Sequence, residues 1–134
     1  MADADPHIAD AHTARPTLKG RKAIITGGTT GIGRAIAVLL ASEGVTVFTG
    51  GRDEGDLADA LDHINKVGTG HGMTCDFART GELDRFFAKG AETLGGYDIA
   101  ILNASVTADG LIDMGEQEVR DAIEINFTGY LLGA

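Results

Sequence analysis

The sequence contains one cysteine, few basic residues and no long hydrophobic run, and each shortage excludes a class of protein. Cys75 has no partner for an internal disulfide, and no Cys/His cluster has metal-ligand spacing, so neither a disulfide framework nor a metal site is predicted. No segment approaches the ~18 consecutive apolar residues of a membrane-spanning helix. The 11 basic and 20 acidic residues give a net charge of -9, which disfavours nucleic acid and anionic membranes as partners.

The first 17 residues differ in composition from the rest of the chain. They are rich in Ala and Asp and lack the apolar centre of a secretory signal or membrane anchor, so we expect a flexible tail at 1–17. Residues 18–134 then form one domain by length, and 43% apolar with 23% charged residues is typical of a soluble globular core. The lone cysteine suits a reducing compartment and favours a cytoplasmic location, with Cys75 buried in the core.

From residue 21 onward, short apolar runs alternate with helical patterns, as in the βα units of a parallel sheet. Strands are expected at 23–25, 45–48, 71–75 and 99–102, and helices at 34–42, near 57–64 and 83–94, and at 116–132. The last helix carries an apolar stripe interrupted by Asn126, which predicts that this amide is buried and hydrogen-bonded. The residues of the stripe are Val119, Ala122, Ile123, Phe127, Tyr130 and Leu131. The prediction is an α/β fold with a Rossmann-type doubly wound parallel sheet, incomplete at about four strands and four helices.

A glycine-rich loop, Thr26–Gly33, joins the first predicted strand to the first helix. Glycines at 27, 31 and 33 allow a sharp turn and a close approach of the backbone to a pyrophosphate, which the helix N-terminus attracts. A nucleotide-hydrolase P-loop needs Gly-Lys-Ser/Thr at the helix start, whereas this chain has Gly33-Arg34-Ala35. The glycine spacing is also wider than the Gly-x-Gly-x-x-Gly of most Rossmann dehydrogenases.

The pattern Thr-Gly-x-x-x-Gly-Ile-Gly resembles the cofactor-binding motif of the short-chain dehydrogenase/reductase family, and four further segments agree in order and spacing. Leu18–Lys22 is similar to the lead-in to the family's first strand. Asp76 matches an acidic residue that contacts adenine, although an Asp there also suits a helix cap. Asn103-Ala104-Ser105 stands where the family usually has Asn-Ala-Gly, and Ile125–Gly129 is similar to the helix segment that carries the Asn of the proton-relay tetrad.

The resemblance implies a set of cofactor-binding residues and one residue of the relay. The expected cofactor residues are Gly27, Thr29, Thr30, Gly31, Ile32, Gly33, Arg52, Asp76, Asn103 and Ala104. Asn126 is the only tetrad member, and a structural role at a helix kink or a water is its alternative.

The end of the second predicted strand should decide between the two nicotinamide cofactors. The resemblance places Gly51 where an acidic residue would bind the ribose diol of NAD(H), and Arg52 follows it. Because Arg can pair with a 2′-phosphate, NADP(H) is favoured and NAD(H) is the alternative. Asp53 could bind a ribose after a small register shift, but we prefer it as the cap of the next helix.

The residues that complete proton transfer in the family cannot be assigned. Ile101 lies four residues after Tyr97, and Ala134 four after Tyr130, so no Tyr-x-x-x-Lys occurs. We therefore expect an N-terminal part of an oxidoreductase that transfers hydride between NADP(H) and a carbonyl or alcohol substrate, truncated before the catalytic segment and inactive alone. The alternative is a non-catalytic dinucleotide-binding or interaction module, and an open sheet edge or the last helix predicts self-association. A methyltransferase-like domain would need an acidic residue where Gly51 stands.

Overall fold

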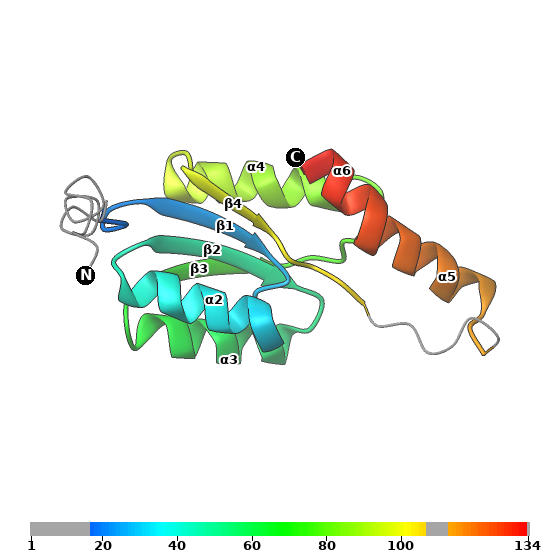
Figure 1. Ribbon diagram of the computed structural model, residues 1–134, viewed down its shortest axis with the longest axis horizontal. Coiled ribbons are helices and arrows are strands. Elements are labelled where there is room, and N and C mark those ends of the chain that lie inside the picture. The colour runs from blue at the N-terminus through cyan, green and yellow to red at the C-terminus, as the bar shows by residue number, and fades with distance from the viewer. Residues whose placement is uncertain (1–16, 107–112, 134) are drawn as a thin grey trace, which may run out of the picture.

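A computed structural model describes residues 17–106 and 113–133 and shows a parallel sheet between helical layers (Figure 1). Residues 1–16 of the predicted tail lie outside the described residues. The strands are β1 (Lys22–Thr26), β2 (Thr46–Gly51), β3 (Thr69–Thr74) and β4 (Ile99–Leu102), in the sheet order β3-β2-β1-β4. The helices are α2 (Gly31–Ser42), α3 (Glu54–Asn65), α4 (Glu82–Leu94), α5 (Glu116–Ile123) and α6 (Gly129–Gly133), with the π-helical turn η1 (Glu124–Thr128) between the last two.

Alternation along β1 divides the core into two layers. Ala23 and Ile25 point toward α2 and α3, whereas Ile24 points toward α4, because successive side chains of a strand face opposite sides. Figure 1 shows α2 and α3 on one face of the sheet and α4 on the other. Phe86 of α4 is fully buried and packs edge-on against Phe77 and at a tilt against Phe48. Both faces of β1 are therefore covered, as expected for an inner parallel strand.

The predicted strands and helices are all present; β4 has the predicted ends, and each of the other elements has at least one shifted end. β3 begins at Thr69, two residues before the predicted start of this strand at position 71. Asn65 at the end of α3 accepts a hydrogen bond from the Gly70 amide at 2.9 Å, which aligns the strand directly after the helix. Gly70 is suited to this place because a Cβ there would lie 3.1 Å from Cβ of Ile64.

Cys75 is buried in the α4 layer at 2% exposure, as the sequence predicts. The thiol donates a hydrogen bond to the carbonyl oxygen of Glu82 at 3.4 Å. Burial raises the pKa of the Cys75 thiol to about 12, with a smaller contribution from the Glu82 carboxylate. The thiol is therefore neutral and packed as an apolar group at physiological pH.

The last helix differs from the prediction in the face that it buries. Within the predicted apolar stripe, Ile123, Phe127 and Leu131 are exposed and Val119 and Ala122 are half-buried. Asn126 is exposed as well. Ile125 is the residue of this helix that enters the core, at 5% exposure. Figure 1 shows the helix extending from the N-terminal end of α4, where α6 lies, outward past the sheet, so it meets the core over a short length only. Among the described residues, no helix has the length and apolarity needed to cross a bilayer.

Candidate functional site

An open cavity of about 360 Å³ lies at the carboxyl ends of β1, β2 and β4. This is the edge of an open parallel sheet where ligands bind, because the loops there diverge to either face. The cavity is lined by all of the predicted cofactor residues except Asp76: Gly27, Thr29, Thr30, Gly31, Ile32, Gly33, Arg52, Asn103 and Ala104. Residues that lie more than 70 positions apart in the sequence are thus brought to one cavity.

The glycine loop turns in a way that its glycines permit. Gly27 and Gly31 have φ values of 67° and 53°, which residues other than glycine rarely adopt. Gly33 has no room for a side chain, since a Cβ there would lie 2.9 Å from the carbonyl carbon of Gly27 and closer still to Nδ2 of Asn103. The loop therefore folds tightly onto the start of α2, as the sequence predicts.

The N-terminus of α2 is not capped by a side chain. Thr30 occupies the N-cap position with no side-chain cap hydrogen bond, and the first turn contains no acidic residue. Ile32 beside it is 75% exposed and lines the cavity. The amides of the first turn and the positive end of the helix dipole are therefore open to an anion in the cavity.

The Thr26 side chain joins the loop to the end of β4. Its Oγ1 accepts hydrogen bonds from the amides of Asn103 at 3.0 Å and Ala104 at 3.1 Å. Asn103 in turn donates from Nδ2 to the carbonyl oxygen of Gly27 at 3.1 Å. These bonds fix the β4 side of the cavity against the glycine loop, and the contact of Asn103 with a cofactor stays a prediction.

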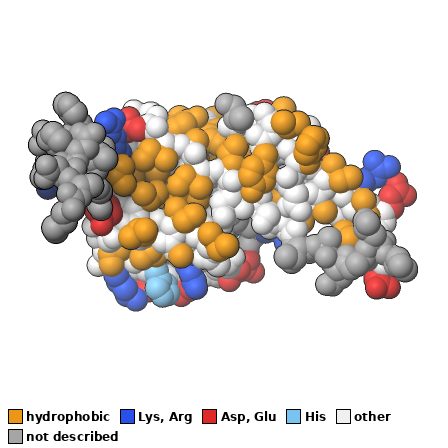
Figure 2. All heavy atoms as spheres, in the orientation of Figure 1, with side chains coloured by type: hydrophobic (Ala, Val, Ile, Leu, Met, Phe, Trp, Pro, Cys, Tyr) orange, Lys and Arg blue, Asp and Glu red, His pale blue; other side chains and the backbone are white. Residues whose placement is uncertain are grey.

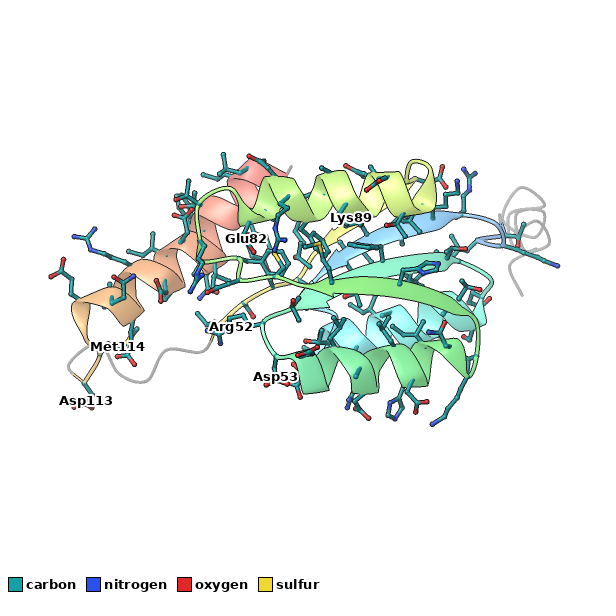
Figure 3. All side chains as sticks on the ribbon, turned by 180° about the vertical axis from the view of Figure 1, so that it is seen from behind. Arg52, Asp53, Glu82, Lys89, Asp113 and Met114 are labelled. Atoms are coloured by element: carbon teal, nitrogen blue, oxygen red, sulfur yellow. The ribbon has the colours of Figure 1, made fainter. Side chains whose placement is uncertain are left out.

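Two charged residues that line the cavity, Arg52 and Asp53, directly follow β2 (Figure 3), and a third, Asp56, lies in the first turn of α3. Asp53 accepts a hydrogen bond from the Asp56 amide at 2.8 Å and occupies the N-cap of α3, which matches the preferred interpretation of this residue. Arg52 is exposed and lines the cavity, and among the described lining residues it is the only cation. It forms no ion pair with any described residue, so its charge is available to a ligand.

Asp76 stands apart from the other predicted residues. Its Oδ1 accepts from the Ala78 amide at 3.1 Å and its Oδ2 lies 3.4 Å from Nε of Arg79, so the carboxylate closes a local turn. It does not cap α4, whose N-cap is Gly81. Because Asp76 does not line the cavity, its contact with adenine stays a prediction.

Asn126 acts on the segment that follows β4. Its Oδ1 accepts from the Val106 amide, and its Nδ2 donates to the Val106 carbonyl oxygen, both at 2.9 Å. Asn126 lies inside η1, where the helix widens to a π-turn. The side chain therefore holds a helix irregularity to the cavity wall, which agrees with the structural alternative, and its part in a proton relay stays a prediction.

Three apolar residues that the sequence did not single out complete the cavity: Phe77, Val106 and Ile125. Phe77 directly follows Asp76 at the carboxyl end of β3, and this position was the available signal. Thr26 was also missed as a separate residue, because a Thr at a strand end gives no sign of which amides its hydroxyl accepts from. Across the described residues, no group of three or more His, Cys, Asp or Glu could hold a metal ion.

Comparison with known proteins identifies the family. A family model described as short chain dehydrogenase matches residues 21–134. The chain belongs to the short-chain dehydrogenase family. These proteins are oxidoreductases with nicotinamide dinucleotide cofactors, and the resemblance inferred from the loop and its companion segments is confirmed.

Three relatives show the extent of the match. A 3-oxoacyl-(acyl-carrier-protein) reductase of Aquifex aeolicus is 36% identical over 118 residues, which are 86% of this short-chain dehydrogenase chain and 48% of that protein. The crystal structure of a short-chain type dehydrogenase/reductase from Mycobacterium marinum superposes with a TM-score of 0.76 at 31% identity, covering 87% of this chain and 48% of that one. The crystal structure of an NADH-dependent reductase complexed with NAD superposes with a TM-score of 0.75 at 30% identity, covering 87% of this chain and 50% of that one. The chain spans about half the length of these relatives.

Proposed function

We propose that the chain binds NADP(H) and forms the cofactor-binding part of an oxidoreductase that transfers hydride between NADP(H) and a carbonyl or alcohol. The observation that supports this best is the combination at one cavity of an uncapped helix N-terminus, a tight glycine loop and an unpaired Arg52. The first two suit the pyrophosphate that both nicotinamide dinucleotides share. Arg52 distinguishes between them.

The preference for NADP(H) rests on the charges at the end of β2. The ribose of NAD(H) is usually recognised by an acidic side chain, but Gly51 offers none and Asp53 already caps α3. Arg52 can instead form charge-assisted hydrogen bonds to a 2′-phosphate. In a chain of net charge -9, a free cation at the cavity also offsets the general repulsion of a phosphorylated ligand.

Proton transfer requires groups that this sequence does not contain. It has no Tyr-x-x-x-Lys, and a tyrosine with a nearby lysine supplies the proton in the family that it resembles. Asn126 contacts Val106 and not the cavity itself. We therefore expect the chain by itself to bind the cofactor without reducing a substrate.

Titration calorimetry with NADPH and NADH tests the proposal. Arg52→Ala should weaken NADPH binding by about 10- to 100-fold, the value of one or two hydrogen bonds to a charged group, and leave NADH binding nearly unchanged. Arg21→Ala is a matched control, because it removes the same charge next to the N-terminal end of β1, whereas the cavity lies at the C-terminal end of that strand. Equal affinities for both cofactors in the wild type and in Arg52→Ala would refute the phosphate assignment.

A second role, as an interaction module, is supported by the exposed apolar surface. β4 pairs only with β1 among the described strands, and Figure 2 shows hydrophobic side chains gathered over β4 and the last helix. Phe127 and Leu131 of that helix are 63% and 65% exposed. Unpaired strand edges and large apolar patches favour association, so we propose that the isolated chain self-associates. Sedimentation velocity should show a dimer or larger species that Phe127→Glu converts to monomer, whereas a wild-type monomer with a high melting temperature would contradict this role.

A further inference from the structure

The last residue of β2 is covered by a threonine of the glycine loop. A Cβ placed on Gly51 would lie 3.2 Å from Cβ of Thr29, 2.9 Å from its Cγ2 and closer still to its Oγ1. Thr29 itself is buried, at 6% exposure, and lines the cavity. We propose that Thr29 and Gly51 form a steric pair that determines cofactor specificity. The pair excludes an acidic side chain from position 51, so that Arg52 is the residue that binds the 2′-phosphate on the ribose.

The exclusion is due to packing and not to backbone conformation. Gly51 is not among the glycines with positive φ, so its backbone would accept any residue. Rotation of Thr29 does not clear the space. A threonine carries two heavy atoms on Cβ, and any staggered rotamer places at least one of them in the two positions that now hold Oγ1 and Cγ2. A side chain at 51 therefore requires a smaller residue at 29.

The steric pair determines whether an acidic or a basic side chain faces a ligand at the end of β2. Gly51 and Arg52 both line the cavity, but position 51 is buried and its Cβ would meet Thr29, whereas position 52 is exposed. With Thr29 present, the first side chain after β2 that can reach a ligand is the cationic Arg52. This inference rests on the proposed function, and it moves the specificity determinant from one residue to a pair that joins the loop to the strand.

A ligand-free stability cycle tests the steric part. Gly51→Ala should lower the melting temperature by about 3 to 10 °C, the range expected for overpacking a fitted site. Adding Thr29→Ala should restore most of that loss. Gly50→Ala is the control, since its Cβ would meet Phe86 and the carbonyl oxygen of Met73 and not Thr29. Recovery of Gly50→Ala by Thr29→Ala to the same degree, or no recovery of Gly51→Ala, would overturn the pair.

A binding cycle then tests the specificity. Gly51→Asp alone should melt lower and bind neither cofactor well. Gly51→Asp with Thr29→Ala should recover stability and gain at least about tenfold in NADH affinity over Thr29→Ala alone, because a carboxylate can then bond the ribose hydroxyls. A switch to NADH by Gly51→Asp that is as large without Thr29→Ala would overturn the proposal. A wild-type chain that binds neither cofactor would refute the proposed function and the specificity role together, whereas failure of the cycle with intact NADPH binding would refute the pair alone.

Discussion

Thr26→Val removes a hydroxyl that serves two backbone amides at once. Thr26 is 3% exposed, and its Oγ1 accepts from Asn103 and Ala104. Valine has nearly the same shape, so the change leaves no large cavity and isolates the loss of the acceptor. An amide left without a partner costs about 1 to 3 kcal/mol when buried, and these two are partly buried, so we expect about 2 to 4 kcal/mol in the free energy of unfolding. For a chain of this size the melting temperature should fall by roughly 6 to 12 °C.

Thermal unfolding followed by circular dichroism measures this loss, with Thr49→Val as the matched control. Thr49 is also fully buried, but its Oγ1 makes a single hydrogen bond, to the carbonyl oxygen of Ile25 at 3.0 Å. Its replacement should cost about 1 kcal/mol, because a carbonyl oxygen that loses one donor is less costly than two orphaned amides. If Thr26→Val melts no lower than Thr49→Val, the threonine does not hold the loop to β4.

Two further predictions concern the buried thiol and the π-turn. The pKa of Cys75 is raised to about 12 from 9.0, so the folded state retains a proton that the unfolded state loses. The contribution of this thiol to the free energy of unfolding should therefore be constant below pH 9 and fall between pH 9 and about 12. Cys75→Ala should make the decline in melting temperature over this pH range less steep. Asn126→Leu removes both hydrogen bonds to Val106, and we expect about 1 kcal/mol lower stability with much faster hydrogen exchange at the Val106 amide. Unchanged exchange there would mean that another group holds the segment.

Most of the sheet could be predicted because its strands are apolar runs. β4 was predicted with the observed ends, Ile99–Leu102, since all four residues are apolar. β2 was predicted to end at Phe48, whereas it continues through Thr49 and two glycines to Gly51. A pair of glycines is typical of a turn, but here both are paired in the parallel sheet, Gly50 with β1 and β3 and Gly51 with β3. Phe86 packs over Gly50 and Thr29 over Gly51. The sequence does not show which distant side chain will fill the space that a glycine leaves.

The orientation of the last helix could not be predicted from its period. A regular helix brings residues at i, i+3 and i+4 to one face, and the stripe from Val119 to Leu131 was identified on that basis. The π-turn at Glu124–Thr128 adds a residue to one turn and changes the phase by about 100° between its two ends. Ile125 then enters the core, while Phe127 stays exposed. The helical period gives no sign of this turn, whose Asn126 is hydrogen-bonded to Val106, a residue 20 positions away in the sequence.

The three glycines of the loop do not carry equal information about a ligand. Gly27 and Gly33 are required by packing alone, because a Cβ would meet Cα of Ala104 at 2.7 Å in the first case and the Gly27 carbonyl in the second. Gly31 is required by its φ of 53° and not by packing, since a Cβ there would meet no atom within 4 Å, and the residue lines the cavity. A glycine that the protein itself does not fill, at an uncapped helix start, is what a bound pyrophosphate would need. The case for an anion at this loop therefore depends on Gly31, the free amides of α2 and Arg52, and much less on the number of glycines.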